Sequence, residues 1–343
     1  MTEYSFGLDT FGDVTVDAAG VPLPHHQVLR NVVAEARLAD QVGIDVFSVG
    51  EHHRDDFAIT APDVVLAAIA SVTEQIKLGT AVTVLSSDDP IRVYERFATL
   101  DALSNGRAEV TLGRGSFTES FPLYGFDLHD YEVLFEEKLD LFAKLRTESE
   151  IAWQGTTRAP LAPTHVYPKT AAGSLPTFVG VGGSPESVIR AARHGLPLMI
   201  AIIGGEPARF APLADLYRRA LDQLGLPLQP IGIHSPGFIA KTDEEARELL
   251  YPHFVANRNR IGAERGWGPT TRAQYDAEAD HGALFVGSPE TVATKIAAAI
   301  QAVGAQRFDL KYSNGSMPHE QLLESIRLYG TEVIPRVREL LAN

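Results

Sequence analysis

An acidic residue followed by two histidines, Glu51-His52-His53, comes directly after a short apolar segment. Carboxylate and imidazole side chains transfer protons near neutral pH, and they also bind metal ions. Because neighbouring residues of an extended segment point to opposite sides, only one of the two histidines can enter a common site. The triplet therefore favours acid–base chemistry by a single histidine and argues against one metal ion held by both.

A second motif with the chemistry of a binding site is Gly182-Gly183-Ser184-Pro185. Ser184 is a preferred N-cap residue, Pro185 is a preferred first helical residue, and the glycines allow the backbone to approach a ligand. Free amides at the start of a helix favour a phosphate group. The related run Gly287-Ser288-Pro289 shows that such a pattern also serves simply to begin a helix. The extra glycine and the strand predicted before it are what favour a ligand here.

Arg114 stands between Gly113 and Gly115 and is a third candidate. A guanidinium group suits phosphate, and flanking glycines indicate a tight turn or close contact with a ligand. The alternative is an ion pair with Glu119 or Glu51. We favour ligand binding, because a partly buried arginine needs an anionic partner.

The elements that position these residues follow a regular pattern, in which short apolar segments alternate with longer amphipathic helical segments. The pattern predicts eight strands, each followed by a helix, which is typical of a parallel sheet closed into a (β/α)8 TIM barrel with insertions. A doubly wound open sheet is the alternative, but it would usually carry a phosphate fingerprint after the first strand, and none is there. The predicted strands are Tyr4–Leu8, Ile44–Gly50, Ile76–Leu85, Arg107–Leu112, Thr177–Gly182, Leu198–Ile203, Ile231–Ala240 and Phe308–Tyr312.

Two segments interrupt this rhythm within the single domain predicted for residues 1–343. Residues 148–172 contain several prolines and are predicted to form an irregular insertion or a small hairpin. The polar segment 262–282 is predicted to form a mobile lid. The three motifs all follow predicted strands, and in such a barrel the carboxyl ends of the strands carry the active site. We therefore expect the three motifs to lie together.

Charge and composition restrict the partners and the compartment. The net charge of −14 and the lack of a basic tract predict neither a nucleic-acid nor a membrane partner. The chain has no cysteine, which excludes disulfides and thiol catalysis. No apolar segment is long enough to span a bilayer, and the first residues do not resemble a secretory signal. We therefore expect a cytoplasmic protein.

Three blocks of the sequence share one resemblance. They are Gly43–Val46 with Glu51–His53, Leu78–Leu85 with Pro90 and Leu100–Gly115, and Val179–Pro185 with Ala192–Pro197. Together they resemble the luciferase-like, flavin-dependent monooxygenase family, which includes the subunits of bacterial luciferase. A weaker similarity runs through Val286–Glu290, so nearly the whole chain is covered. The combination of blocks is specific, although no single block would be.

The resemblance implies a (β/α)8 barrel that holds FMN at its mouth. Arg114 and the glycine turn after the fifth strand would bind the phosphate, and the isoalloxazine ring would lie on the Ala81–Val82 bond, which matches a non-proline cis peptide in luciferase. Relatives often have an acid and a serine where this chain has Val181 and Gly182, so the resemblance implies backbone rather than side-chain contacts from this strand. The residues that the resemblance places against the cofactor are Ala81, Val82, Thr83, Arg114, Gly182, Gly183 and Ser184.

The implied reaction begins with reduced FMN supplied by a separate NAD(P)H:flavin reductase. Reaction with O2 would give a C4a-peroxyflavin that oxygenates a small organic substrate, and the matching catalytic histidine, His52, would manage its proton. Glu51 is a second catalytic candidate, and His53 has no assigned role. The resemblance also implies a homodimer.

Three other functions are open. On the same fold, the deazaflavin F420 as cofactor would make the protein a hydride-transfer oxidoreductase. The long acidic tail of F420 requires additional basic residues at the barrel mouth, and lysine is scarce there. Flavin binding without turnover is another alternative. A metal-dependent hydrolase is the last, and the opposed imidazoles argue against it.

Overall fold

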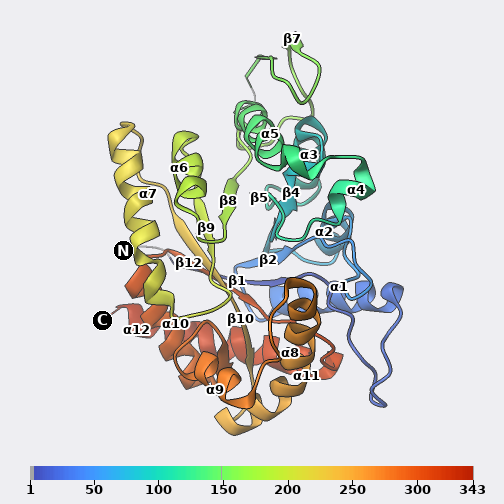
Figure 1. Cartoon of the computed structure of the whole chain (residues 1–343), viewed down its shortest axis with the longest axis vertical. Helices are drawn as coiled ribbons and strands as arrows, with labels where there is room; N and C mark the ends of the chain where they lie inside the picture. The colour runs from blue at the N-terminus through green and yellow to red at the C-terminus, as the bar shows by residue number, and fades with distance from the viewer. Residues whose placement is uncertain (1–3, 148, 343) are drawn as a thin grey trace.

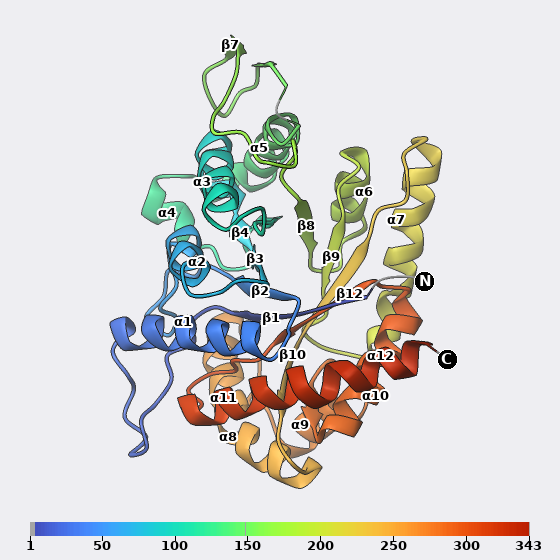
Figure 2. The same ribbon diagram turned by 180° about the vertical axis from the view of Figure 1, so that it is seen from behind.

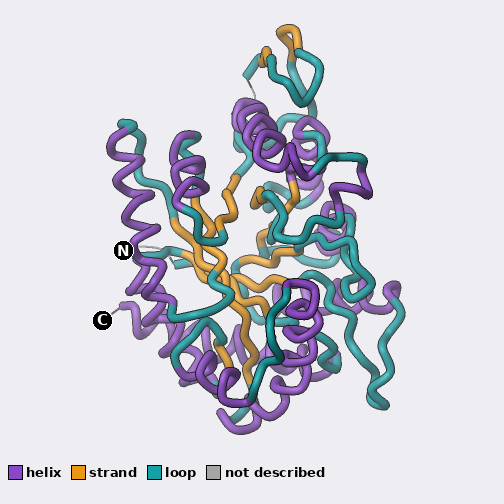
Figure 3. Tube along the Cα trace, viewed as in Figure 1, coloured by secondary structure: helices purple, strands orange, loops and turns teal. Residues whose placement is uncertain are grey.

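A parallel sheet forms the centre of the molecule (Figure 1, Figure 3). Its strands are β1 (Ser5–Thr10), β2 (Val46–Val49), β3 (Lys77–Thr80), β4 (Thr83–Val84), β5 (Val110–Gly113), β8 (Thr177–Val181), β9 (Leu198–Ala201), β10 (Ile231–Ile239), β11 (Phe285–Gly287) and β12 (Arg307–Lys311). They run in the order β3-β2-β1-β12-β10-β9-β8-β5-β4, and β11 pairs with β10. A parallel bridge between Leu78 of β3 and Ala108, just before β5, closes this order into a ring. The predicted (β/α)8 barrel is therefore confirmed, and the open sheet was the wrong alternative.

Helices surround the barrel on its outside (Figure 2). They are α1 (His25–Gln41), α2 (Pro62–Ala70), α3 (Pro90–Leu103), α4 (Ser120–Tyr124), α5 (Tyr131–Leu145), α6 (Pro185–Arg193), α7 (Ala211–Gln223), α8 (Asp243–Arg265), α9 (Arg272–Asp280), α10 (Pro289–Val303), α11 (His319–Leu328) and α12 (Ile334–Ala342). In α1 the stripe Val28, Val32 and Ala36 is buried, as expected for a helix with one apolar face. In the described part of the chain, no helix is both long and apolar enough to cross a membrane.

The computed structural model describes residues 4–147 and 149–342. Residues 1–3 and 343 of the predicted domain, and residue 148 of the predicted insertion, lie outside the described residues. Within the insertion, β6 (Ile151–Trp153) and β7 (Leu161–Thr164) pair in antiparallel fashion. This hairpin projects beyond α5 (Figure 1). The alternative of a small hairpin was therefore correct.

The polar segment 262–282 is largely helical. It contains the end of α8 and all of α9, which begins with a capping box between Thr271 and Gln274. Only a few of its residues are buried, among them Tyr275 and Ala279. Because so narrow an apolar stripe leaves the segment polar overall, its hydrophobic pattern did not indicate the second helix.

The interior of the barrel carries charged side chains. Arg307 pairs with Asp309 at 2.8 Å and also with Glu109. His234 Nδ1 lies 2.7 Å from Asp9 Oδ2. Burial opposes a charge on His234, but the Asp9 carboxylate outweighs this effect and raises the histidine pKa. These pairs satisfy one another inside the ring of strands, below the strand ends that carry the predicted site.

Candidate active site at the strand ends

His52 follows β2 and lies among three aromatic rings. The centroid of its imidazole is 4.6 Å from that of Phe11, 4.7 Å from that of Phe57 and 4.6 Å from that of Phe117. Burial, reinforced by the positive charge of Lys311, lowers the pKa of His52 to about 3. The imidazole is therefore neutral and only weakly basic at physiological pH, so it can accept or donate a hydrogen bond but carries no positive charge.

His53 has different surroundings from His52, as expected for neighbours in an extended segment. Its ring meets Tyr124 of α4 edge-on, with centroids 5.3 Å apart. Burial lowers the pKa of His53, and the carboxylate of Glu119 opposes that shift. Among the described residues, no group of three histidine, aspartate or glutamate side chains is arranged to hold a metal ion. The two imidazoles therefore have different neighbours.

The segment after β3 forms a shelf at the barrel mouth. The peptide bond between Ala81 and Val82 is cis. A Cβ on Gly113 would lie 2.4 Å from the Val82 side chain, and a Cβ on Gly180 would lie 2.9 Å from it. A Cβ on Gly50 would lie 2.5 Å from the Ala81 carbonyl oxygen. Only glycine allows these close approaches, so Ala81 and Val82 pack directly onto the ends of β2, β5 and β8.

Two further hydrogen bonds fix the segment beyond this shelf. The backbone amide of Val84 donates to Glu51 Oε1 at 2.7 Å. Thr83 is buried, and its hydroxyl donates to Thr80 Oγ1 at 3.2 Å. Burial raises the pKa of Glu51 to about 7, although the Val84 amide favours its ionised form. Glu51 is thus a titratable group near neutral pH that also holds the backbone in place.

The start of α6 presents polar groups after β8. Ser184 is the N-cap residue, and its Oγ accepts from the Ser187 amide at 3.2 Å and contacts Ser187 Oγ at 2.8 Å. Gly183 before it has a φ of 120°, which favours glycine. Arg190 lies further along the same helix, and its Nη1 is 3.4 Å from Ser187 Oγ. The predicted N-cap is confirmed, and an arginine stands beside it.

Arg114 approaches the same place from the end of β5. Its guanidinium pairs with Glu132 of α5 and lies 5.3 Å from the ring centroid of Tyr131. The other oxygen of Glu132 accepts from Arg190 Nη2 at 3.0 Å. Arg190 also pairs with Glu136. One carboxylate thus bridges two arginines beside α6, and we call Arg114, Arg190, Ser184 and Ser187 the anion cradle.

The sequence interpretation named the wrong carboxylates for an ion pair with Arg114. Glu119 pairs instead with Arg54 at 3.1 Å, and Glu51 binds a backbone amide. Residues on α5 and α6 were missed, because pairing between different helices leaves no local pattern. Arg190 had one usable signal: it stands three residues after Ser187, and residues three apart lie on the same face of a helix.

The end of α8 covers the histidine side of the mouth. Glu264 forms two hydrogen bonds with Arg54, at 2.6 and 2.7 Å. Arg265 lies 4.8 Å from the ring centroid of Phe117 and donates to the Ser116 carbonyl oxygen at 3.2 Å. Since Phe117 contacts His52, this helix end shields the imidazole from one side.

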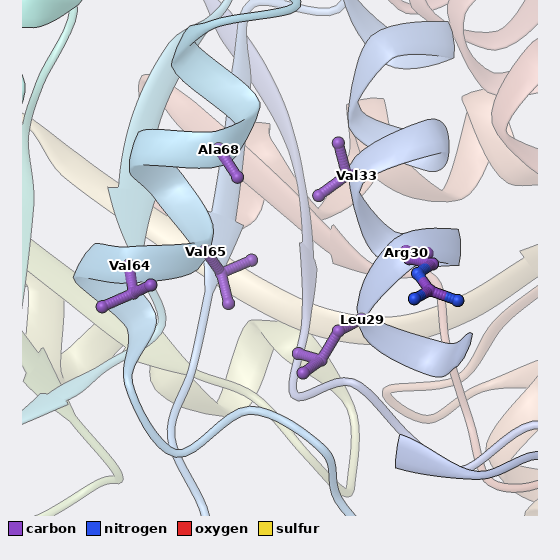
Figure 4. A pocket seen from close by; sticks show the side chains of 6 residues that line it. All are labelled: Leu29, Arg30, Val33, Val64, Val65 and Ala68. Atoms are coloured by element: carbon purple, nitrogen blue, oxygen red, sulfur yellow. The ribbon is translucent and has the colours of Figure 1, made fainter. Parts of the chain in front are cut away.

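A separate apolar groove lies on the outside of the barrel, between α1 and α2. Its volume is about 340 Å³. Figure 4 shows Leu29 and Val33 of α1 on the side that faces Val65 and Ala68 of α2. It is lined by Leu29, Arg30, Val33, Val64, Val65 and Ala68. These residues belong to surrounding helices rather than to strand ends, so the groove is not part of the site described above.

The chain matches known proteins along most of its length. Residues 10–307 match the luciferase-like monooxygenase family. N-acetyl-S-alkylcysteine monooxygenase of Bacillus subtilis is 30% identical over 292 residues, which cover 78% of this chain and 82% of that protein. The alkanal monooxygenase alpha chain of Photorhabdus luminescens is 24% identical and covers 91% of this chain and 92% of its own length. The chain therefore belongs to the luciferase-like monooxygenase family.

Solved structures show the same fold. Monooxygenase RslO1 from Streptomyces bottropensis superposes with a TM-score of 0.83 at 23% identity, over 96% of this chain and 99% of that chain. The oxygenating constituent of 3,6-diketocamphane monooxygenase from Pseudomonas putida, in complex with FMN, gives 0.77 at 18% identity, over 98% and 99%. The F420-dependent tetrahydromethanopterin reductase of Methanopyrus kandleri gives 0.73 at 18% identity, over 98% and 99%.

Proposed function

We propose that the protein is an FMN-dependent monooxygenase that uses reduced flavin and O2 to oxygenate a small organic substrate. Membership of the luciferase-like monooxygenase family supports this class of reaction. One geometric feature supports it most strongly. A continuous row of contacts runs from His52 and Phe11, over the Ala81–Val82 shelf, to Gly113 and Gly180, whose strands lead into the anion cradle.

The residues of this row fit FMN. Two guanidinium groups and a capped helix start suit a phosphate monoester. The Ala81–Val82 shelf, packed on glycines, offers a surface for a planar ring between the cradle and His52. When bound in its reduced form, FMN would supply the electrons and the ring carbon at which O2 is activated.

The protein side chains would bind, shield and control protons. Neutral His52 would form a hydrogen bond with the reacting group and so position its proton. The rings of Phe11, Phe57 and Phe117 would exclude water from that position. Glu51, whose pKa lies near neutrality, would hold the shelf and is the second proton carrier within the same strand end.

The partners are proposed from the family. A separate NAD(P)H:flavin reductase would supply the reduced cofactor, and the protein would act as a homodimer in the cytoplasm. The substrate class follows from relatives whose names specify an alkanal, an N-acetyl-S-alkylcysteine and a diketocamphane. All three are small organic molecules, and we propose a substrate of that class.

Stopped-flow mixing tests the proposed function. Anaerobic protein with reduced FMN is mixed with O2, and the return of oxidised-flavin absorbance is followed. The wild type should slow this return relative to free flavin, because the site would shield the reacting ring from water. His52→Ala should shorten the delay while it leaves FMN binding nearly unchanged. Identical traces with and without wild-type protein would refute the proposal, and a delay that His52→Ala does not change would favour flavin binding without turnover.

One observation favours F420-dependent hydride transfer as the second candidate. Arg265 is exposed near His52, and within the described chain no carboxylate lies in ion-pair distance of it. Such a cation would suit the acidic tail of F420. Difference absorbance titrations with FMN and F420 separate the two. Tighter binding of F420, lost in Arg265→Gln, would favour the second candidate.

A further inference from the structure

Glu132 lies between the two guanidinium groups of the anion cradle. One of its carboxylate oxygens contacts Arg114, and the other lies 3.0 Å from Arg190 Nη2. A carboxylate that spans two guanidinium groups makes the contacts that two oxygens of a phosphate would make. The chain therefore supplies its own anion to the site.

The exposed fractions of the three side chains indicate which of them can move. The Glu132 side chain is 61% exposed, whereas Arg114 is 27% and Arg190 is 10% exposed. A largely exposed carboxylate can rotate into water at little cost, because an ion pair on the surface is weak. The arginines are held by their surroundings: Arg190 by Glu136 and Ser187, and Arg114 against Tyr131.

We propose that Glu132 competes with the cofactor phosphate for Arg114 and Arg190, and so makes the flavin an exchangeable co-substrate rather than a permanently held group. This inference rests on the proposed function. Within the described chain, Glu132 is the carboxylate that pairs with Arg114, whereas Arg190 keeps Glu136 when Glu132 leaves. Arg114 is therefore the residue that the phosphate takes over, and Glu132 sets how tightly it binds.

Glu132 and Glu136 offer a matched comparison on one helix. Glu136 contacts Arg190 and Arg193 but not Arg114. Glu132→Gln should tighten FMN binding by about three- to tenfold, because it removes a charged competitor. Riboflavin, which lacks the phosphate, should bind both proteins alike. Glu136→Gln should change FMN affinity less than Glu132→Gln does.

The experiment measures dissociation constants for FMN and riboflavin by flavin fluorescence in the wild type, Glu132→Gln, Glu132→Ala and Glu136→Gln. Unchanged or weaker FMN binding in both position-132 variants would overturn the inference and would instead make Glu132 a residue that orients Arg114. An equal gain for riboflavin would also overturn it, because that gain would not depend on the phosphate.

A second readout separates this inference from the proposed function. Inorganic phosphate alone should raise the melting temperature of Glu132→Gln more than that of the wild type, since it would bind the freed arginines. If the wild type binds neither flavin, the proposed function fails, but this phosphate effect still tests the competition. Equal phosphate effects in the two proteins would refute the role of Glu132.

Discussion

The carboxylate of Glu51 accepts a hydrogen bond of 2.7 Å from the backbone amide of Val84. This bond joins the end of β2 to β4, on the far side of the cis bond between Ala81 and Val82. The residue next to His52 therefore also fixes the shelf on which we place the flavin ring. A single carboxylate links proton chemistry and the geometry of the mouth.

Glu51→Gln should make the stability of the protein less dependent on pH. Folding raises the Glu51 pKa from 4.5 to about 7, so the folded state binds more protons between these values. The stabilising contribution of Glu51 to the free energy of unfolding is complete below pH 4.5 and is lost as the pH rises to about 7. Its size is on the order of 3 kcal/mol. The free energy of unfolding in urea, measured at pH 4.5 and at pH 7, should fall more for the wild type than for Glu51→Gln. An equal fall in the two proteins would contradict the pKa shift of Glu51.

The pKa values of His52 and His234 should be shifted in opposite directions from that of free histidine. Burial and the nearby Lys311 lower the pKa of His52 to about 3, whereas Asp9 raises the pKa of His234. Nitrogen chemical shifts of labelled histidine, assigned with His52→Gln and His234→Gln, should show His52 neutral from about pH 5 to 8. His234 should keep its proton above the ordinary histidine range. A normal titration of His52 would mean that its aromatic surroundings are open to water.

Gly113→Ala should destabilise the protein and disturb the shelf. The new Cβ would lie 2.4 Å from the Val82 side chain, and such overpacking costs about 1–3 kcal/mol. The double variant with Val82→Ala should recover most of this loss, because the clashing atoms are removed. Gly204→Ala is the control, since no atom lies within 4 Å of its added Cβ. Thermal unfolding measures all four proteins, and full stability of Gly113→Ala alone would contradict the packing described here.

Arg307→Ala should strongly reduce the free energy of unfolding. It would leave Glu109 and Asp309 buried without their cation, and breaking such a pair costs about 3–5 kcal/mol. Arg336→Ala removes an exposed ion pair with Glu290 and should have little effect, because water already screens that pair. Denaturant unfolding measures the free energy of unfolding of both variants. Similar decreases in that free energy would show that burial does not determine how much each ion pair contributes.

Seven of the eight predicted barrel strands are single strands in the structure, because fully buried parallel strands read as short apolar runs. The remaining one, Ile76–Leu85, is divided into β3 and β4 around the cis bond, and the short strand β11 was not predicted. The position of His52 at a strand end followed from the predicted strands, and so did the N-cap role of Ser184. The bridge from Arg114 through Glu132 to Arg190 could not be predicted. It joins side chains from three separate elements, and no local spacing encodes such a meeting.

The charges inside the barrel were missed for a related reason. In β12, Arg307 and Asp309 alternate with apolar residues, and that pattern normally indicates a strand with one face in water. Here the polar face turns inward, where Glu109 completes the pairing. The strand was predicted at Phe308–Tyr312, but its sequence did not reveal that its polar side chains face the interior.

The aromatic surroundings of His52 have a consequence for altering this protein. Phe11, Phe57 and Phe117 come from three different loops, each after a different strand, and all three rings meet one imidazole. In barrels of this kind such loops are where new substrate preferences arise. Selection for a new substrate that changes any of them would therefore also alter the basicity of His52. If His52 acts as proposed, we expect substrate range and pH dependence to change together, and libraries that vary one loop at a time should repeatedly recover variants with shifted pH optima.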